Sequence, residues 1–290
     1  MKIGLIDVDG HHFPNVALMK FSAWHKKQGD TVEWANIGNY DITYMSKVFT
    51  FTPEPQMRLG SYGKIIKGGT GFRSYENLPP AVDLICPDYS IYPMFSAGYG
   101  FITRGCPNHC PWCIVPRKEG NIYAYSDIEE WLDGRKEAII MDNNILAHEH
   151  GIIQLEKMAK LGIKVDINQG FEAARITPGI ARLLSKIKFI RYIRLACDTK
   201  QNIPYVEKAV SNLSKAGIKP YRVFCYILVK EDIQDALYRI EYMRKLGVNP
   251  FAQPYRDFEN VVMPTPQQKR LARWCNRKEI FKSCGFESYK

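Results

Sequence analysis

The sequence predicts an α/β protein in which β-strands and α-helices alternate along most of the chain. Between residues 99 and 253, apolar residues recur with alternating strand and helix periods, and we count six strands joined by five helices. Three helix-to-strand connections share a glycine followed by a β-branched residue, at Gly162, Gly217 and Gly247. A glycine there favours the left-handed conformation that ends a helix. Right-handed crossovers would curl such a run into a barrel or part of one.

Residues 1–96 form a separate small α/β unit in this interpretation. The pattern predicts a strand at 3–8, a helix at 15–28 closed by Gly29, a strand at 31–37 and an extended segment at 44–51. Strand, helix and strand in this order imply a parallel βαβ start. A turn at 68–71 contains three glycines, a pattern that either cradles a phosphate or simply allows a tight bend.

Residues 97–262 contain the six strands and five helices. Ser126 is expected to cap the first helix with Glu129 in a capping box, and Thr177 to cap the third, with Pro178 in its first turn. The expected strands are 99–103, 137–141, 163–168, 192–196, 219–226 and 248–253, and the expected helices are 126–134, 149–161, 177–187, 203–216 and 232–246. Residues 263–290 contain one further basic helix, expected from 264 to about 284, whose apolar face includes Leu271 and Trp274.

Composition limits the classes of function. The chain has 290 residues, and its 40 basic against 30 acidic residues give a net charge of +10, which permits an anionic partner such as nucleic acid. No run of apolar residues is long enough for a membrane span. Acidic residues at Asp7 and Asp9 favour a first strand over a signal peptide. Eight cysteines without an export signal indicate a reducing compartment, and we therefore expect the cytoplasm.

Three cysteines stand close together at Cys106, Cys110 and Cys113, with the spacing C-x3-C-x2-C. Three thiolates on one loop can hold three irons of a [4Fe-4S] cluster and leave the fourth iron open to a small molecule. Structural zinc is the alternative, with His109 as a fourth ligand. The other five cysteines do not repeat this spacing, so no second cluster is expected.

This cysteine loop resembles that of the radical S-adenosylmethionine (radical SAM) enzymes. The resemblance implies that SAM binds the open iron and is cleaved reductively to methionine and a 5′-deoxyadenosyl radical, which abstracts hydrogen from a substrate. It also implies a partial (β/α)6 barrel, and a reductant such as flavodoxin or ferredoxin. The aromatic residue before the third cysteine usually lies near the adenine, and here that residue is Trp112.

The N-terminal unit resembles the Rossmann-like domain of the cobalamin-binding branch of that family. That branch carries an Asp-x-His-x-x-Gly motif, whereas the corresponding stretch here reads Asp7-Val8-Asp9-Gly10-His11-His12. The motif occurs nowhere else in the chain. We therefore expect a vestigial or repurposed domain without cobalamin.

Polar residues at the ends of the barrel strands are the candidates for binding SAM or substrate, because active sites of parallel barrels lie there. Asn143 and Asn144 follow Asp142 at the end of the second strand, and they could bind the amino group of the methionine moiety. Gln169, Glu172 and Arg175 follow the third strand, where they could bind the ribose and carboxylate. Alternation places Arg194 and Asp198 on one face of the fourth strand. No catalytic residue is assigned.

Three functions remain open on this sequence. The first is a radical SAM enzyme that acts on a nucleotide or nucleic acid, supported by the net charge and the basic final helix. The second is a radical SAM enzyme that acts on a small metabolite or peptide. The third is a non-catalytic zinc or iron–sulfur module that binds nucleic acid. The sequence specifies neither the substrate nor the oligomeric state.

Overall fold

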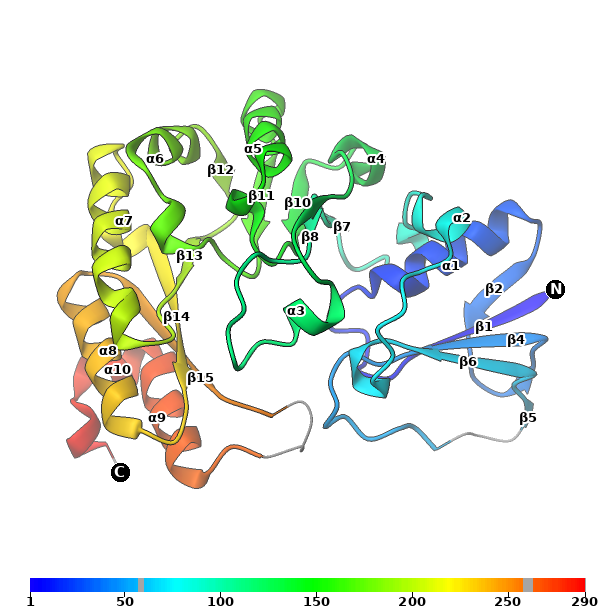
Figure 1. Ribbon diagram of the computed structural model, residues 1–290. Coiled ribbons are helices and arrows are strands. Elements are labelled where there is room, and N and C mark those ends of the chain that lie inside the picture. Colours follow the sequence, from blue (N-terminus) through cyan, green and yellow to red (C-terminus); the bar gives the residue numbers. More distant parts are fainter. Residues whose placement is uncertain (57–59, 258–262, 290) are drawn as a thin grey trace. The chain divides into compact units, whose positions relative to one another are not determined.

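The computed structural model describes residues 1–56, 60–257 and 263–289 (Figure 1). The chain divides into two compact units: Met1–Gly100 with Asp127–Lys136, and Phe101–Ser126 with Glu137–Lys290. Both are α/β structures built on parallel strands. The segment in which one C-terminal helix was predicted belongs to the second unit. The expected end of the barrel at residue 262 lies outside the described residues, as does residue 290.

The first unit is organised around a parallel sheet with the strand order β2-β1-β4-β6. The predicted βαβ start is confirmed, since β1 and β2 pair in parallel on either side of α1 in the sequence. Ile3, Leu5, Leu18 and Tyr44 form its buried core. The helices and strands of this unit are β1 Lys2–Asp7, α1 Val16–Lys27, β2 Thr31–Trp34, β3 Gly38–Asn39, β4 Ile42–Ser46, β5 Gly60–Ser61, β6 Lys64–Gly68, α2 Pro80–Asp83, β7 Gly98–Gly100 and α4 Glu129–Leu132.

The extended segment expected at 44–51 ends early, because β4 stops at Ser46. The carboxylate of Asp9 accepts hydrogen bonds from the backbone of Val48 (2.5 Å) and from the hydroxyl of Thr52 (2.6 Å). These bonds hold the chain in a loop after the strand. A side-chain contact from a distant part of the sequence therefore overrides the strand preference of the aromatic residues that follow.

The second unit contains two sets of parallel strands. β10, β11 and β12 pair in one set, and β13, β14 and β15 pair in the other. A parallel bridge between Phe171 and Leu195 links the segment after β11 to β13. The helices and strands of this unit are β8 Thr103–Arg104, α3 Val115–Lys118, β9 Tyr123–Ala124, β10 Glu137–Ile140, α5 Glu149–Leu161, β11 Lys164–Ile167, α6 Pro178–Leu184, β12 Lys188–Phe189, β13 Ile193–Ala196, α7 Ile203–Lys215, β14 Val223–Val229, α8 Ile233–Lys245, β15 Asn249–Pro254, α9 Pro266–Asn276 and α10 Lys278–Ser283.

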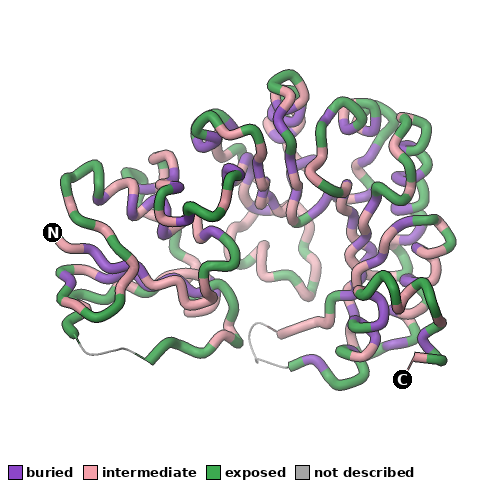
Figure 2. Tube along the Cα trace, turned by 180° about the vertical axis from the view of Figure 1, so that it is seen from behind, coloured by how far each residue is buried: buried purple, intermediate pink, exposed green. Residues whose placement is uncertain are grey.

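Burial alternates along the strands of this unit, as Figure 2 shows by colour. Along β14, Val223, Cys225, Ile227 and Val229 are buried, whereas the intervening residues are only partly buried. The fully buried face packs with α8, whose Ala236, Ile240 and Met243 are completely inaccessible. The other face presents aromatic side chains, and this is the face on which ligand-binding groups would stand.

The predicted helix ends are confirmed. Gly162, Gly217 and Gly247 all adopt positive φ, at 64°, 91° and 72°. Thr177 caps α6 through a bond from the backbone N–H of Ile180 to its hydroxyl (3.2 Å). These features depend on contacts within a few residues, which is why sequence alone predicts them.

Two predicted features are wrong. Ser126 caps no helix, because its hydroxyl donates to the backbone carbonyl of Phe101 (2.6 Å), and α4 begins only at Glu129. The single C-terminal helix is two helices, interrupted at Arg277. At that break the Asn276 side chain bonds the backbone N–H and C=O of Ala252 (2.8 and 3.0 Å), which ties the helix pair to β15.

The predicted apolar face of this C-terminal segment is confirmed. Leu271 and Trp274 are completely buried, and α9 packs against β15 and α8. Across the described residues, no helix combines the length and apolar character that crossing a membrane requires.

Candidate functional site

The three clustered cysteines lie on the loop between β8 and β9, which pair as antiparallel strands at its base. The backbone N–H of Cys106 donates to the carbonyl of Gly120 (3.1 Å), and that of Cys113 donates to Cys110 (3.0 Å). Gly105 opens the loop with φ 77°, and a Cβ there would collide with the carbonyl of Asn121. The loop is therefore closed by a hairpin and ordered by its own backbone bonds.

Glu119 holds the base of this loop together. Its carboxylate accepts two hydrogen bonds from the guanidinium of Arg104 (3.0 and 2.9 Å), one from the backbone N–H of Gly105 (3.0 Å) and one from the amide of Asn143 (2.9 Å). The side chain is only 7% exposed. Burial disfavours its charged form, but the charge of Arg104 and the bonds from Gly105 and Arg104 outweigh burial and lower the pKa of Glu119. Glu119 is therefore an ionised carboxylate at neutral pH.

The three thiols of the loop form no disulfide, and neither do the other five cysteines. Cys106 and Cys110 are partly buried, and Cys113 is exposed. Burial raises the pKa of Cys110, and the neighbouring thiols of the same loop raise it further. A bound cation would reverse this effect, because it stabilises thiolates.

Within the described part of the chain, no three His, Cys, Asp or Glu side chains converge as the ligands of one metal ion do. A four-iron cluster differs from a single ion in this respect, because each thiolate binds a separate iron and the ligands need not meet at one point.

Asn144 connects the cysteine loop to the residues after β11. Its amide nitrogen donates to the carboxylate of Glu172 (2.7 Å) and lies 3.7 Å from the sulfur of Cys106. Glu172 also accepts a bond from Arg175 (2.6 Å) and one from the side chain of Asn108. Burial opposes ionisation of this carboxylate, but the bonds from Asn144 and Arg175 prevail and lower the pKa of Glu172. The structure thus brings together three residues predicted from separate strand ends.

The side-chain oxygen of Asn144 is buried and has no hydrogen-bond partner among the described residues. An unsatisfied buried carbonyl is costly, at roughly 1–3 kcal/mol. The residue is only 3% exposed. A ligand that places a hydrogen-bond donor next to Cys106 would therefore satisfy the Asn144 oxygen and remove this cost.

Asp142 and Asn143 serve the loop itself. Asp142 is completely buried and accepts bonds from the backbone N–H groups of Ile102 (2.7 Å) and Thr103 (2.6 Å), and from the hydroxyl of Thr103 (2.6 Å). Burial raises the pKa of Asp142 to about 6, with these bonds acting in the opposite direction. Asn143, expected at the ligand, instead donates to Glu119.

Trp112 and Asp198 also meet. The Trp112 side chain lies next to Asp198, and the ammonium of Lys230 lies 4.1 Å from the centre of its indole ring. Burial raises the pKa of Asp198, although the charge of Arg239 and the Trp112 side chain act against this. The two residues were predicted independently, from the cysteine motif and from a strand end.

Arg194 and Asp198, which were predicted to share one face of the fourth strand, have different partners. Arg194 forms a two-point ion pair with Asp166 on the adjacent β11 (2.7 and 2.5 Å) and donates to the hydroxyl of Tyr226 (2.9 Å). Burial would lower its pKa, but the bonds with Asp166 and the charge of that residue raise the pKa of Arg194. Asp198 lies beyond the end of β13, which stops at Ala196. Gln169 is exposed.

Sequence reasoning missed Glu119 and Asp166. Asp166 had a signal, because it alternates with the buried residues Val165 and Ile167 and so shares a face with Arg194 of a nearby strand. Glu119 had none, since its partners come from both sides of the loop and from another strand end. No family model matches the sequence, and no curated protein matches it.

Proposed function

We propose that this protein is a radical SAM enzyme, in which Cys106, Cys110 and Cys113 would hold a [4Fe-4S] cluster. The observation that carries the proposal is the cysteine loop: three thiols free of disulfides, spaced C-x3-C-x2-C, on a hairpin-closed loop anchored by a buried carboxylate. The cluster, when bound, supplies the electron for reductive cleavage of SAM. The remaining chemistry at this site belongs to the chain's own residues.

Two features of the site fit a bound SAM. The buried oxygen of Asn144 lacks a donor among the described residues, and the α-amino group of SAM is a donor. Arg175 is 37% exposed while it bonds Glu172 through Nε, so its guanidinium can reach a ligand carboxylate or ribose. We assign Asn144 to the amino group, and Glu172 with Arg175 to the ribose and carboxylate.

Trp112 and Asp198 form the second half of the proposed SAM site. Lys230 covers one side of the indole ring, and we assign the adenine to the other face. Asn143 and Arg194 have structural roles in the proposal, because Glu119 and Asp166 already engage them. This revises which candidates contact the ligand.

We also propose that the second unit is a partial (β/α)6 barrel. The parallel pairing within β10–β12 and within β13–β15 supports it, as does the bridge from Phe171 to Leu195. Glu172 and Asp198 both follow the carboxyl ends of strands, where barrel enzymes place their sites. A nucleotide or nucleic acid is the proposed substrate class, on the net charge of +10. The proposed reductant is a flavodoxin or ferredoxin, in the cytoplasm.

Anaerobic reconstitution with iron and sulfide tests the proposal. We expect about four irons per chain with matching sulfide, and 5′-deoxyadenosine on addition of SAM and dithionite. Cys110→Ser should lose both, whereas Cys284→Ser, a partly buried cysteine outside the loop, should retain both.

Three results would contradict it. One zinc per chain with no iron would support the structural module instead. Iron with sulfide but no cleavage of SAM would limit the protein to electron transfer. Full activity in Cys110→Ser would overturn the ligand assignment.

A further inference from the structure

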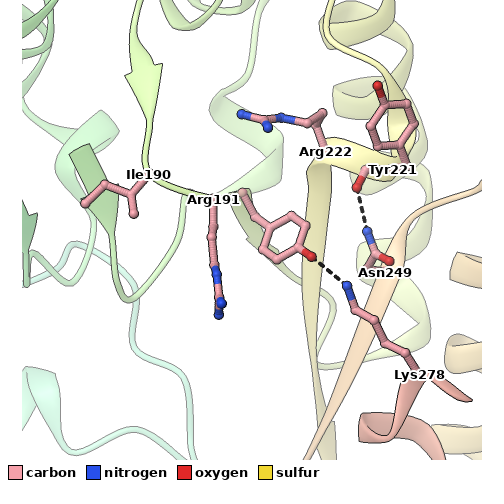
Figure 3. A pocket seen from close by; sticks show the side chains of 7 residues that line it. Ile190, Arg191, Tyr221, Arg222, Asn249 and Lys278 are labelled. Atoms are coloured by element: carbon pink, nitrogen blue, oxygen red, sulfur yellow. Dashed lines mark hydrogen bonds between the residues drawn. The ribbon is translucent and has the colours of Figure 1, made fainter. Parts of the chain in front are cut away.

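A basic pocket lies at the opposite ends of the strands from the cysteine loop (Figure 3). Its volume is about 410 Å³. It opens where β13, β14 and β15 begin and where α10 starts. The residues that line it are Ile190, Arg191, Tyr192, Tyr221, Arg222, Asn249 and Lys278.

The pocket gathers positive charge without acidic partners. Arg191, Arg222 and Lys278 are all exposed, and none of the described lining residues is acidic. Within the described residues, neither arginine forms an ion pair. Three cations around one hollow repel one another, and a concave surface strengthens the positive potential that they create.

The three cations of the pocket all lower the pKa of the Tyr192 phenol. The ammonium of Lys278 donates to its hydroxyl (2.6 Å), and this bond together with the charges of Lys278, Arg191 and Arg222 lowers the pKa of Tyr192. The ring stacks on Phe224, 5.6 Å between centroids, so it is held in place. Tyr192 and Lys278 therefore form a fixed wall of the pocket.

Tyr221 contributes an exposed aromatic residue to the lining of the pocket. It is 66% exposed. Its backbone is fixed, because the amide of Asn249 donates to its carbonyl (2.6 Å). Exposed aromatic rings next to cations are the usual means of binding single-stranded nucleic acids, through base stacking and phosphate contacts.

We propose that this pocket binds the sugar–phosphate backbone of a single-stranded nucleic acid, with Arg191, Arg222 and Lys278 on phosphates and Tyr221 against a base. A pocket of about 410 Å³ is in the range of small-ligand sites and can take one nucleotide of a strand. β14 has seven residues, so the pocket lies roughly 23 Å along the strand from its carboxyl end. The inference does not depend on the iron–sulfur proposal, since it concerns the other ends of these strands.

Fluorescence anisotropy with a labelled 12-nucleotide single-stranded RNA tests this, using protein without reconstituted iron. With three phosphate contacts, the logarithm of the binding constant should fall with the logarithm of salt with a slope of about −2. Arg191→Glu/Arg222→Glu should weaken binding about 25-fold at 0.1 M salt, from about 5-fold per contact. Tyr221→Ala should weaken it about 5- to 100-fold.

The matched control is Arg182→Glu/Lys208→Glu, which makes the same charge change at exposed positions of α6 and α7. It should bind within about 2-fold of wild type if the pocket carries the contacts. Circular dichroism confirms that each variant is folded. A failure of the RNA-binding prediction would leave the iron–sulfur proposal unaffected, because the two are tested by different measurements.

Competition separates the sources of anion. Unlabelled RNA should displace the probe far better than inorganic phosphate, a mononucleotide or poly-L-glutamate of equal charge. Equal competition by poly-L-glutamate would overturn the proposal in favour of an acidic protein partner. Equal competition by phosphate or a mononucleotide, or equal weakening in the control variant, would overturn it as well.

Discussion

The ion pair of Arg104 with Glu119 should behave as one energetic unit that holds the cysteine loop. Glu119→Leu removes the acceptor for four hydrogen bonds and leaves the guanidinium of Arg104, 17% exposed, without its carboxylate. Breaking a buried pair from one side costs about 3–5 kcal/mol. Arg104 also stacks on Phe101, 4.2 Å from the ring centre, and this contact survives the change. We therefore expect a loss of about 3 kcal/mol in unfolding free energy.

The opposite single variant, at Arg104, is needed to measure the coupling energy between Arg104 and Glu119. Arg104→Met leaves the Glu119 carboxylate with hydrogen bonds from Gly105 and Asn143 and with the ammonium of Lys118 at 3.8 Å, and we expect a loss of about 2–3 kcal/mol. The double variant removes both charges, so its loss should be smaller than the sum by about 2–3 kcal/mol. Unfolding in urea is monitored by hydrogen exchange of peptides from β13–β15. This measurement reports on the second unit alone.

The coupling should also depend on pH in one direction. The pKa of Glu119 is lowered from its ordinary 4.5 in the folded protein. Its stabilisation is therefore complete above pH 4.5 and disappears as the pH falls through the depressed folded value. Additive single changes at pH 7, or a coupling that grows in acid, would refute the role given to this pair.

Three further outcomes are expected. Gly105→Ala should lower reconstituted iron several-fold while the far-ultraviolet circular dichroism stays unchanged, because a Cβ collides with Asn121; normal iron content would show that the loop tolerates another conformation. Arg239→Met should lower the free energy of unfolding in urea by about 3–5 kcal/mol. The Arg239 side chain is 1% exposed, pairs with Asp235 and donates to the backbone carbonyls of Cys197 and Leu228. A loss under about 1 kcal/mol would contradict these bonds. Leu213→Ala, at a completely buried position of α7, should cost about 2.7–5 kcal/mol in the same assay, and a smaller loss would mean that the helix is less tightly packed than described.

Local features of this fold were predictable from the sequence. The glycines that end α5, α7 and α8, the cap at Thr177 and the buried side of α9 all depend on residues a few positions apart. The parallel α/β class followed from the alternation of strands and helices. Ser126 shows the limit of this reasoning, because its hydroxyl found a backbone carbonyl 25 residues away instead of its own helix.

The parts of the candidate site that the sequence predicted are the cysteine loop and the polar residues at the strand ends. The cysteines stand on one loop, and Asn144, Glu172 and Arg175 form one network, as the positions of strand ends suggested. For Arg194, alternation along one strand predicted a face but not a partner. The partner, Asp166, comes from an adjacent strand, and sequence separation hides it.

The hairpin that closes the cysteine loop has a consequence for how the protein matures. β8 and β9 fix both ends of the loop, and Glu119 holds its base, so much of the conformational entropy of the loop is lost during folding. If the protein holds the proposed cluster, iron and sulfide would bind to a loop that is already folded. On that proposal, we expect a chelator to remove the iron reversibly without unfolding the chain.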